Sequence, residues 1–351
     1  MDTLTHALSG ALLVRAAEPA LPRLKALPVR IRLIAGMTAA AFPDMDVVLR
    51  LIDTLIYLNW HQGPTHSLVM LPLWAFLLAH LFSKVARGRY SWQLFLIPSG
   101  LGIAIHITED LMTSYGVMLL APFSTERFSL PLAFVVDLWF SAIIILGLVM
   151  SYIFPEKKFI AGSVLICLII YVVFLFTLHE RARDIGVAYA QKMALPDTEI
   201  RVLPQPFSPF NWHIIVIQGE IYHTLLMKLL SNSSGSSAVF PDHGILSKML
   251  AAYQPLNSAK WQQYKRFGDI PVDTMLVREA WHQPALADFR RFAVFPQFDK
   301  IDTSEKGVCI WFYDLRFKFP ILPPSFRYGG CREEGSAKWY LQRQKGAFWI
   351  D

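Results

Sequence analysis

Long apolar runs fill the first half of this 351-residue chain and are almost absent from the second half. A run of about 20 mostly apolar residues is long enough to cross a bilayer as a helix. Only 17% of the residues are charged, against about 25% in a typical soluble domain. The sequence therefore predicts an α-helical membrane domain over residues 1–180, followed by a mostly β soluble domain over residues 181–351.

About six membrane helices are expected, of which the first is short. Three apolar runs are uninterrupted, and polar residues interrupt two others. The expected helices cover residues 3–17, 30–52, 66–84, 93–115, 131–154 and 159–179.

Basic residues of the first half gather in alternate loops between these helices. Such loops face the cytoplasm under the positive-inside rule, which predicts that the C-terminal domain lies outside the cytoplasm. The net charge of +6 forms no basic stripe, so no nucleic-acid partner is expected. The loop residues are Arg23, Lys25, Arg30, Arg32, Lys84, Arg87, Arg89, Lys157 and Lys158.

The second half alternates apolar and polar residues in short runs that are typical of strands. Strands are expected at 199–203, 213–218, 221–229, 291–298, 308–319 and 337–349, and a helix near 243–254. Cys309 and Cys331 could form a disulfide if this half is extracytoplasmic, or could be two unrelated thiols.

Five polar clusters interrupt the apolar half, and each carries residue types that bind metals. Ionisable groups inside a bilayer cost roughly 2.5–3.5 kcal/mol each on insertion scales, so they are rarely incidental. The predicted topology places all five on the outer side of the membrane. The clusters are Asp2–His6, Phe42–Asp46, His61–Ser67, His106–Asp110 and Asp137.

His106 and Asp110 stand four residues apart and would share one face of a helix, so one metal could contact both. A purely structural hydrogen-bonded pair is the alternative. Glu109 points about 100° away along the helix and is a candidate general base, or alternatively a group that contacts and supports a metal ligand.

Asp44 and Asp46 follow Pro43, which should break the helix and let carboxylates turn inward as metal ligands. His61 and His66 flank a Gly-Pro turn at a helix mouth, where a turn can aim side chains into a pocket. For a single residue of either kind, a cap or a structural role is the ordinary interpretation.

Three candidates stand alone. His6 is a possible ligand near the N-terminus. Asp137 is a candidate catalytic carboxylate, with an N-cap as its alternative. Arg127 is a candidate for binding a substrate phosphate or carboxylate, with a surface or headgroup contact as its alternative.

Several ordered motifs resemble the YdjM-type family, bacterial inner-membrane proteins that are predicted to be metal-dependent hydrolases. The resemblance covers about residues 1–155 and implies a location in the bacterial inner membrane. It extends distantly to zinc-dependent phospholipase C and P1-type nucleases, and by that analogy it implies His6, Asp44, His66, His106 and Asp110 as ligands. The motifs are Met1-Asp-Thr-Leu-Thr-His6-Ala, Phe42-Pro-Asp44-Met-Asp46, His61-Gln-Gly-Pro-Thr-His66-Ser, and Asp110-Leu-Met-Thr-Ser-Tyr-Gly116 followed by Ala121-Pro-Phe-Ser.

The expected function is a membrane-bound hydrolase with one to three divalent ions, zinc first among them. Its substrate would be a phosphoester or a lipid-linked molecule at the outer face. Two alternatives stay open: an ion-coupled transporter, because intramembrane Asp and His also form proton relays, and a metal-stabilised scaffold that binds a protein partner.

Overall fold

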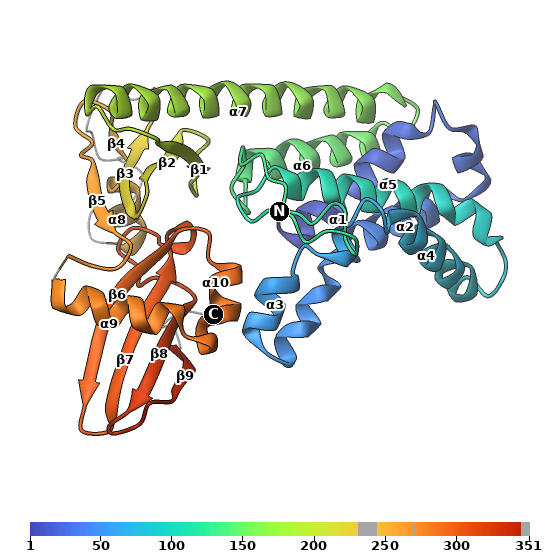
Figure 1. The fold of residues 1–351 in the computed structure, drawn as a ribbon. Coiled ribbons are helices and arrows are strands. Elements are labelled where there is room, and N and C mark those ends of the chain that lie inside the picture. Colours follow the sequence, from blue (N-terminus) through green and yellow to red (C-terminus); the bar gives the residue numbers. More distant parts are fainter. Residues whose placement is uncertain (231–243, 270, 345–351) are drawn as a thin grey trace. The chain divides into compact units, whose positions relative to one another are not determined.

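The computed structural model describes residues 1–230, 244–269 and 271–344. The chain divides into two compact units. Unit 1 comprises Met1–His179 with the short segment Pro204–Pro209, and unit 2 comprises Glu180–Leu203 with Phe210–Asp351. Figure 1 shows the helices of unit 1 in blue to green and the sheets of unit 2 in yellow to red.

Unit 1 is helical. Its short 3₁₀ helices lie where proline or a turn interrupts an apolar run. Its elements in chain order are α1 (Thr3–Ala17), η1 (Pro22–Ala26), α2 (Val29–Ala41), η2 (Pro43–Leu51), α3 (Thr54–Trp60), η3 (Pro64–His66), α4 (Leu71–Val85), α5 (Trp92–Leu111), α6 (Leu138–Ile153) and the greater part of α7 (Phe159–Lys192).

The expectation of about six membrane helices is not matched. In the described residues, two helices are long and apolar enough to cross a membrane: α5 and α7. A third span is reached if Thr54–His66 and Leu71–Val85, which are bent by 81° at a break, together form one.

Local chemistry explains why the other expected spans are shorter. Proline cannot continue a helix without losing a backbone hydrogen bond, and the expected helix over 30–52 ends before Pro43, where η2 begins. The expected helix over 131–154 begins only at Leu138, because Asp137 caps it by accepting hydrogen bonds from the N–H groups of Trp139 and Phe140.

Helices α1, α2 and α5 pack with their backbones in close approach, as small residues allow in membrane bundles. A Cβ atom added at Gly10 would lie 2.5 Å from the carbonyl oxygen of Gly36, and one added at Gly102 would also lie 2.5 Å from that oxygen. His6, Ala40 and His106 each lie four residues, about one helical turn, from one of these glycines. The glycine contacts therefore determine how closely the polar clusters approach.

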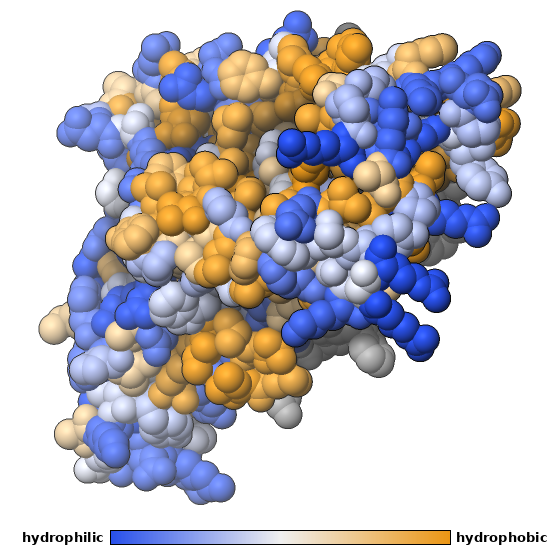
Figure 2. All heavy atoms as spheres, turned by 90° about the vertical axis from the view of Figure 1, so that its right-hand side faces the viewer, coloured by the Kyte–Doolittle hydropathy of each residue, from blue (hydrophilic) through white to orange (hydrophobic). Residues whose placement is uncertain are grey.

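Unit 1 also exposes large apolar side chains, as expected for a surface that faces lipid. Figure 2 shows one face of the molecule, on which hydrophobic residues form patches between hydrophilic ones. Exposed apolar residues on α4 and α7 include Leu77, Leu81, Ile166, Ile169 and Ile170.

Unit 2 holds two sheets in its described residues. The first has the order β1-β2-β3-β4, with β5 also paired to β3, and the second has the order β6-β7-β8-β9. Strand β3 pairs antiparallel with β2 and β5 and parallel with β4. In the second sheet, each strand pairs antiparallel with the next. The strands are β1 (Glu199–Pro204), β2 (Asn211–Gln218), β3 (Ile221–Lys228), β4 (Gln254–Pro255), β5 (Gln262–Lys265), β6 (Pro296–Ser304), β7 (Gly307–Asp314), β8 (Arg327–Glu333) and β9 (Trp339–Gln344), and the helical elements are α8 (Ile245–Ala251), α9 (Pro271–His282), η4 (Pro284–Leu286), α10 (Ala287–Phe292) and η5 (Leu315–Phe317).

The expectation of a mostly β second half is therefore confirmed. The strand expected at 291–298 is displaced, because α10 extends to Phe292 and β6 begins only at Pro296. Strand β8 was not expected, since Gly329 and Gly330 interrupt any alternation of side chains. Part of the strand expected at 337–349, and residue 243 of the expected helix, lie outside the described residues.

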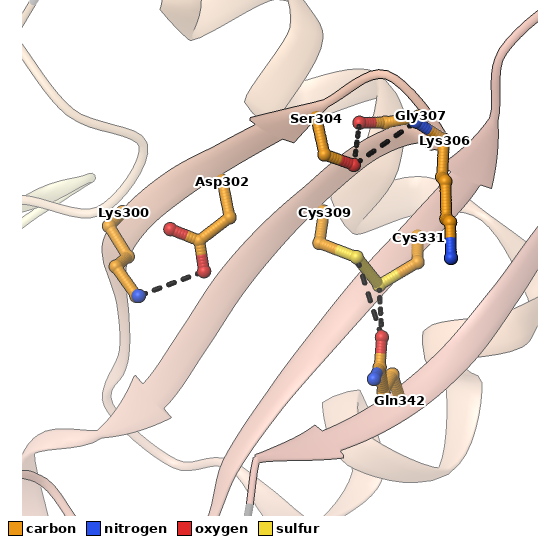
Figure 3. The surroundings of a disulfide bond; sticks show 8 residues. All are labelled: Lys300, Asp302, Ser304, Lys306, Gly307, Cys309, Cys331 and Gln342. Carbon is orange, nitrogen blue, oxygen red and sulfur yellow. Dashed lines mark hydrogen bonds and ion pairs between the residues drawn. A yellow bond between two sulfur atoms is a disulfide. The ribbon is translucent and has the colours of Figure 1, made fainter.

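Cys309 on β7 and Cys331 on β8 form a disulfide and are directly opposite each other in the antiparallel register. Figure 3 shows Gln342 of β9 beside the bridge, with its side-chain oxygen 3.1 Å from the sulfur of Cys331. Cys167 on α7 is a free, exposed thiol.

Candidate metal centre

Four residues of unit 1 direct potential ligand atoms toward one point. His6 comes from α1, Asp44 from η2, and His106 and Asp110 from α5, and their ligand atoms all lie within 4.8 Å of one another. All but the half-buried Asp44 are buried. The i, i+4 spacing of His106 and Asp110 does bring the pair together, with His106 Nε2 3.2 Å from Asp110 Oδ2.

His66 completes this group from the short helix η3. Its Nε2 atom lies 3.2 Å from Asp110 Oδ2 and 3.7 Å from Asp44 Oδ1. Trp74 holds the η3 turn by donating to the carbonyl oxygen of Pro64, and Ser67 donates to the carbonyl oxygen of Ala121. We call His6, Asp44, His66, His106 and Asp110 the five-residue cluster.

The three histidines of the cluster share one orientation. In each, Nδ1 is bound outside the cluster: to Glu109 in His6 at 2.7 Å, to the Thr65 hydroxyl in His66 at 2.9 Å, and to the Ala40 carbonyl oxygen in His106 at 2.6 Å. Each Nε2 atom faces Asp110. A partner on one ring nitrogen, which fixes the tautomer and leaves the other nitrogen to the metal, is the usual arrangement of metal-binding histidines.

Three buried polar atoms of the cluster make no hydrogen bond in the described chain, and their polar contacts are with one another and with Asp44 at ion-pair distance. They are His66 Nε2, His106 Nε2 and Asp110 Oδ2. A buried polar atom without a partner costs about 1–3 kcal/mol, and here the three atoms converge. Imidazole and carboxylate are the ligands that zinc and neighbouring divalent ions prefer. The residues present therefore fit a divalent cation.

Asp46 and His61, both expected as ligands, form a pair beside the cluster. His61 Nδ1 lies 2.9 Å from Asp46 Oδ1, and the backbone N–H of Gln62 donates to Asp46 Oδ2. Asp46 Oδ2 also lies 3.6 Å from His66 Nδ1. The structure thus places this pair behind His66, on the side away from the converging Nε2 atoms.

The other candidate residues occupy different positions. Glu109 is buried and binds His6, and its second oxygen, Oε1, has no partner among the described residues. Asp137 is the N-cap of α6 and also accepts a hydrogen bond from the Tyr171 hydroxyl. Arg127 donates to the carbonyl oxygens of Asn59, His61 and Gly116, so its guanidinium holds the His61 loop.

Residues that the sequence did not single out also contact the cluster. The α-amino group of Met1 donates to Asp110 Oδ1, and the Thr3 hydroxyl donates to Asp44 Oδ2. Thr65 and the Ala40 carbonyl oxygen orient two histidines. Threonines and backbone carbonyls are common everywhere in a sequence, so only the tertiary structure reveals these roles.

Comparison with known proteins places the cluster within a recognised region. The sequence pattern of the family described as YdjM inner membrane protein matches residues 1–182, which contain every residue of the cluster. The chain is also 28% identical over 137 residues to the uncharacterized protein YfhP of Bacillus subtilis (strain 168). That alignment covers 38% of this chain and 40% of the relative. No solved structure matches.

Proposed function

The chain belongs to the YdjM inner membrane protein family, and we propose that it is a membrane-bound hydrolase that depends on a divalent metal, with zinc as the first candidate. The observation that carries this proposal is the convergence of three histidine Nε2 atoms and two aspartates in one place. Three of these atoms, His66 Nε2, His106 Nε2 and Asp110 Oδ2, make no hydrogen bond in the described chain and contact one another only at ion-pair distance.

The residues of the chain would hold and orient the metal. His6, His66 and His106 would bind through Nε2, with Asp44 and Asp110 as carboxylate ligands. A divalent ion bound there would polarise a phosphoryl oxygen and lower the pKa of a water molecule. Glu109 is the proposed proton acceptor. It contacts His6 of the cluster through Oε2, and its other oxygen, Oε1, makes no hydrogen bond within the described residues.

The substrate class that we propose is a phosphoester or a lipid-linked molecule. His106 and Asp110 lie on α5, which is long and apolar enough to cross a membrane, so a substrate that resides in the bilayer would lie close to the cluster. The disulfide of unit 2 supports an outward orientation of that unit, since disulfides persist in the periplasm and are rare in the cytosol.

The decisive experiment measures metal content and hydrolysis on the same purified protein. Elemental analysis should find a stoichiometric divalent ion. A screen with bis(p-nitrophenyl) phosphate and with labelled phospholipids should show turnover that a chelator abolishes. We expect His66→Asn and His106→Asn to lose most of the bound metal and at least about 100-fold in rate.

A matched control is available in the same unit. His80 on α4 contacts the ring of Trp92 and lies outside the cluster, so His80→Gln should keep both metal and activity. Wild-type protein without stoichiometric metal would contradict the proposal. Bound metal without turnover of any ester, together with proton-coupled uptake into vesicles, would favour the transporter alternative instead.

A further inference from the structure

Unit 2 contains a cavity of about 560 Å³ that is separate from the metal cluster. It lies among β2, β3, β5 and the segments around 252–260 and 315–322. Ligand cavities are typically about 300–1,000 Å³, so this one is large enough for a small organic molecule.

A fixed lysine lines the cavity. The ammonium group of Lys318 lies 3.2 Å from the Tyr313 hydroxyl and 3.5 Å from the Tyr264 hydroxyl, and it is also 4.7 Å from the centre of the Tyr264 ring. No carboxylate forms an ion pair with Lys318 within the described chain. A positive charge held in place without a protein counterion is suited to binding an anion.

The remaining polar lining agrees with an anionic ligand. Lys260 adds a second cation, while the Thr224 hydroxyl and the Gln262 side-chain amide add neutral groups that can donate hydrogen bonds; the Tyr264 hydroxyl already donates to the Gln262 side-chain oxygen. No aspartate or glutamate is among the described lining residues. The buried ring of His213 lines the cavity as well, and no hydrogen bond to it occurs in the part of the chain that the structure describes.

An apolar wall faces these groups. It is formed by Leu226, Leu315 and the run Phe319–Leu322. Within that run Ile321 has φ +71°, a backbone conformation that β-branched residues rarely adopt, and its side chain is 56% exposed. Conformations of this kind cluster at ligand contacts.

We propose that this cavity binds an amphipathic anion: an oxyanion head held by Lys318 and the neighbouring donors, and a short apolar chain against Leu315 and Phe319–Leu322. The shared chemistry is a carboxylate or phosphate monoester carried on an alkyl body. The proposal rests on unit 2 alone and does not depend on hydrolysis at the metal cluster.

The test uses full-length protein in a neutral detergent, treated with a chelator so that the metal cluster cannot bind phosphate. Calorimetric titrations with hexyl phosphate and hexanoate should show saturable binding. Inorganic phosphate and hexanol, which carry only the head or only the chain, should each bind roughly tenfold or more weakly. The relative affinities of hexyl phosphate and hexanoate distinguish a phosphate from a carboxylate source.

Lys318→Met keeps the length of the side chain and removes its charge, and it should weaken hexyl phosphate binding by roughly tenfold or more. Lys306→Met, at an exposed turn outside the cavity, is the matched control and should bind as the wild type does. Binding that survives Lys318→Met, that falls equally in Lys306→Met, or that is equally strong for hexanol would overturn the proposal. Loss of binding in His66→Asn would assign the ligand to the metal cluster and would also overturn it.

Discussion

At the scale of single residues, the candidate centre depends on side chains that hold the ligands as much as on the ligands themselves. Glu109 is the clearest example, because it binds Nδ1 of His6 at 2.7 Å. Partners of this kind raise the basicity of a metal-binding imidazole and fix its ring.

Glu109→Gln should therefore weaken metal binding by about 10–100-fold, as is typical when the partner of a metal-binding histidine is lost. Competition with a chromophoric chelator measures the affinity. Glu126→Gln, which alters an exposed carboxylate of the same unit, is the control. An unchanged affinity in Glu109→Gln would show that Glu109 does not support the metal through His6.

His213 in unit 2 gives a prediction about pH. Burial, together with the neighbouring charge of Lys318, lowers the pKa of His213 to about 4, from 6.5 in a solvated histidine. The unfolded chain therefore binds a proton between pH 6.5 and 4 that the folded chain does not bind, and stability must fall as the pH falls through this range.

The loss should approach roughly 3 kcal/mol as an upper bound. Urea unfolding of unit 2, followed by tryptophan fluorescence at pH 7 and pH 4.5, measures it. His213→Gln should reduce the difference between the two pH values. If the variant shows the same pH dependence as the wild type, another group is responsible.

At the scale of elements, the close packing of α1, α2 and α5 brings the cluster together. Gly102 on α5 lies against the backbone of Gly36 on α2, one turn before His106. Two helices whose backbones are in contact cannot accept a methyl group between them without moving apart.

Gly102→Ala should therefore separate α5 from α2, destabilise unit 1 by about 1–3 kcal/mol and reduce metal content. Gly100→Ala on the same helix has open space around the added Cβ and should be neutral or stabilising by up to about 1 kcal/mol. Thermal unfolding in detergent and elemental analysis of both variants provide the comparison. If the two variants have the same thermal stability and the same metal content, the close approach of α5 and α2 at Gly102 does not hold the cluster together.

At the scale of the whole molecule, the three cysteines report where unit 2 resides. Cys309 and Cys331 are bonded to each other and Cys167 is free. If unit 2 is extracytoplasmic, as we propose, protein taken directly from cells and denatured should bind one maleimide before reduction and three after it.

Replacing both bonded cysteines by serine opens a loop with a sequence separation of 22 residues and should destabilise unit 2 by about 2–4 kcal/mol. Cys167→Ser is the control and should leave stability unchanged. Three reactive thiols before reduction would place unit 2 in a reducing compartment.

The sequence by itself determined the class of each half and the chemistry of the polar clusters. The length of an apolar run and the alternation of apolar and polar residues are local properties of a sequence. Helices in the first half and strands in the second could therefore be predicted. The i, i+4 pair His106 and Asp110 also follows from local geometry, and the structure brings that pair into contact.

Only the tertiary structure decided which polar residues converge and how many helices are long enough to span a membrane. Pro43 and the Asp137 cap shorten apolar runs that hydropathy alone would extend. Asp44 and Asp46 are two residues apart, yet one faces the cluster and the other binds His61. Contacts between distant segments make this choice, and nothing in the local sequence encodes it.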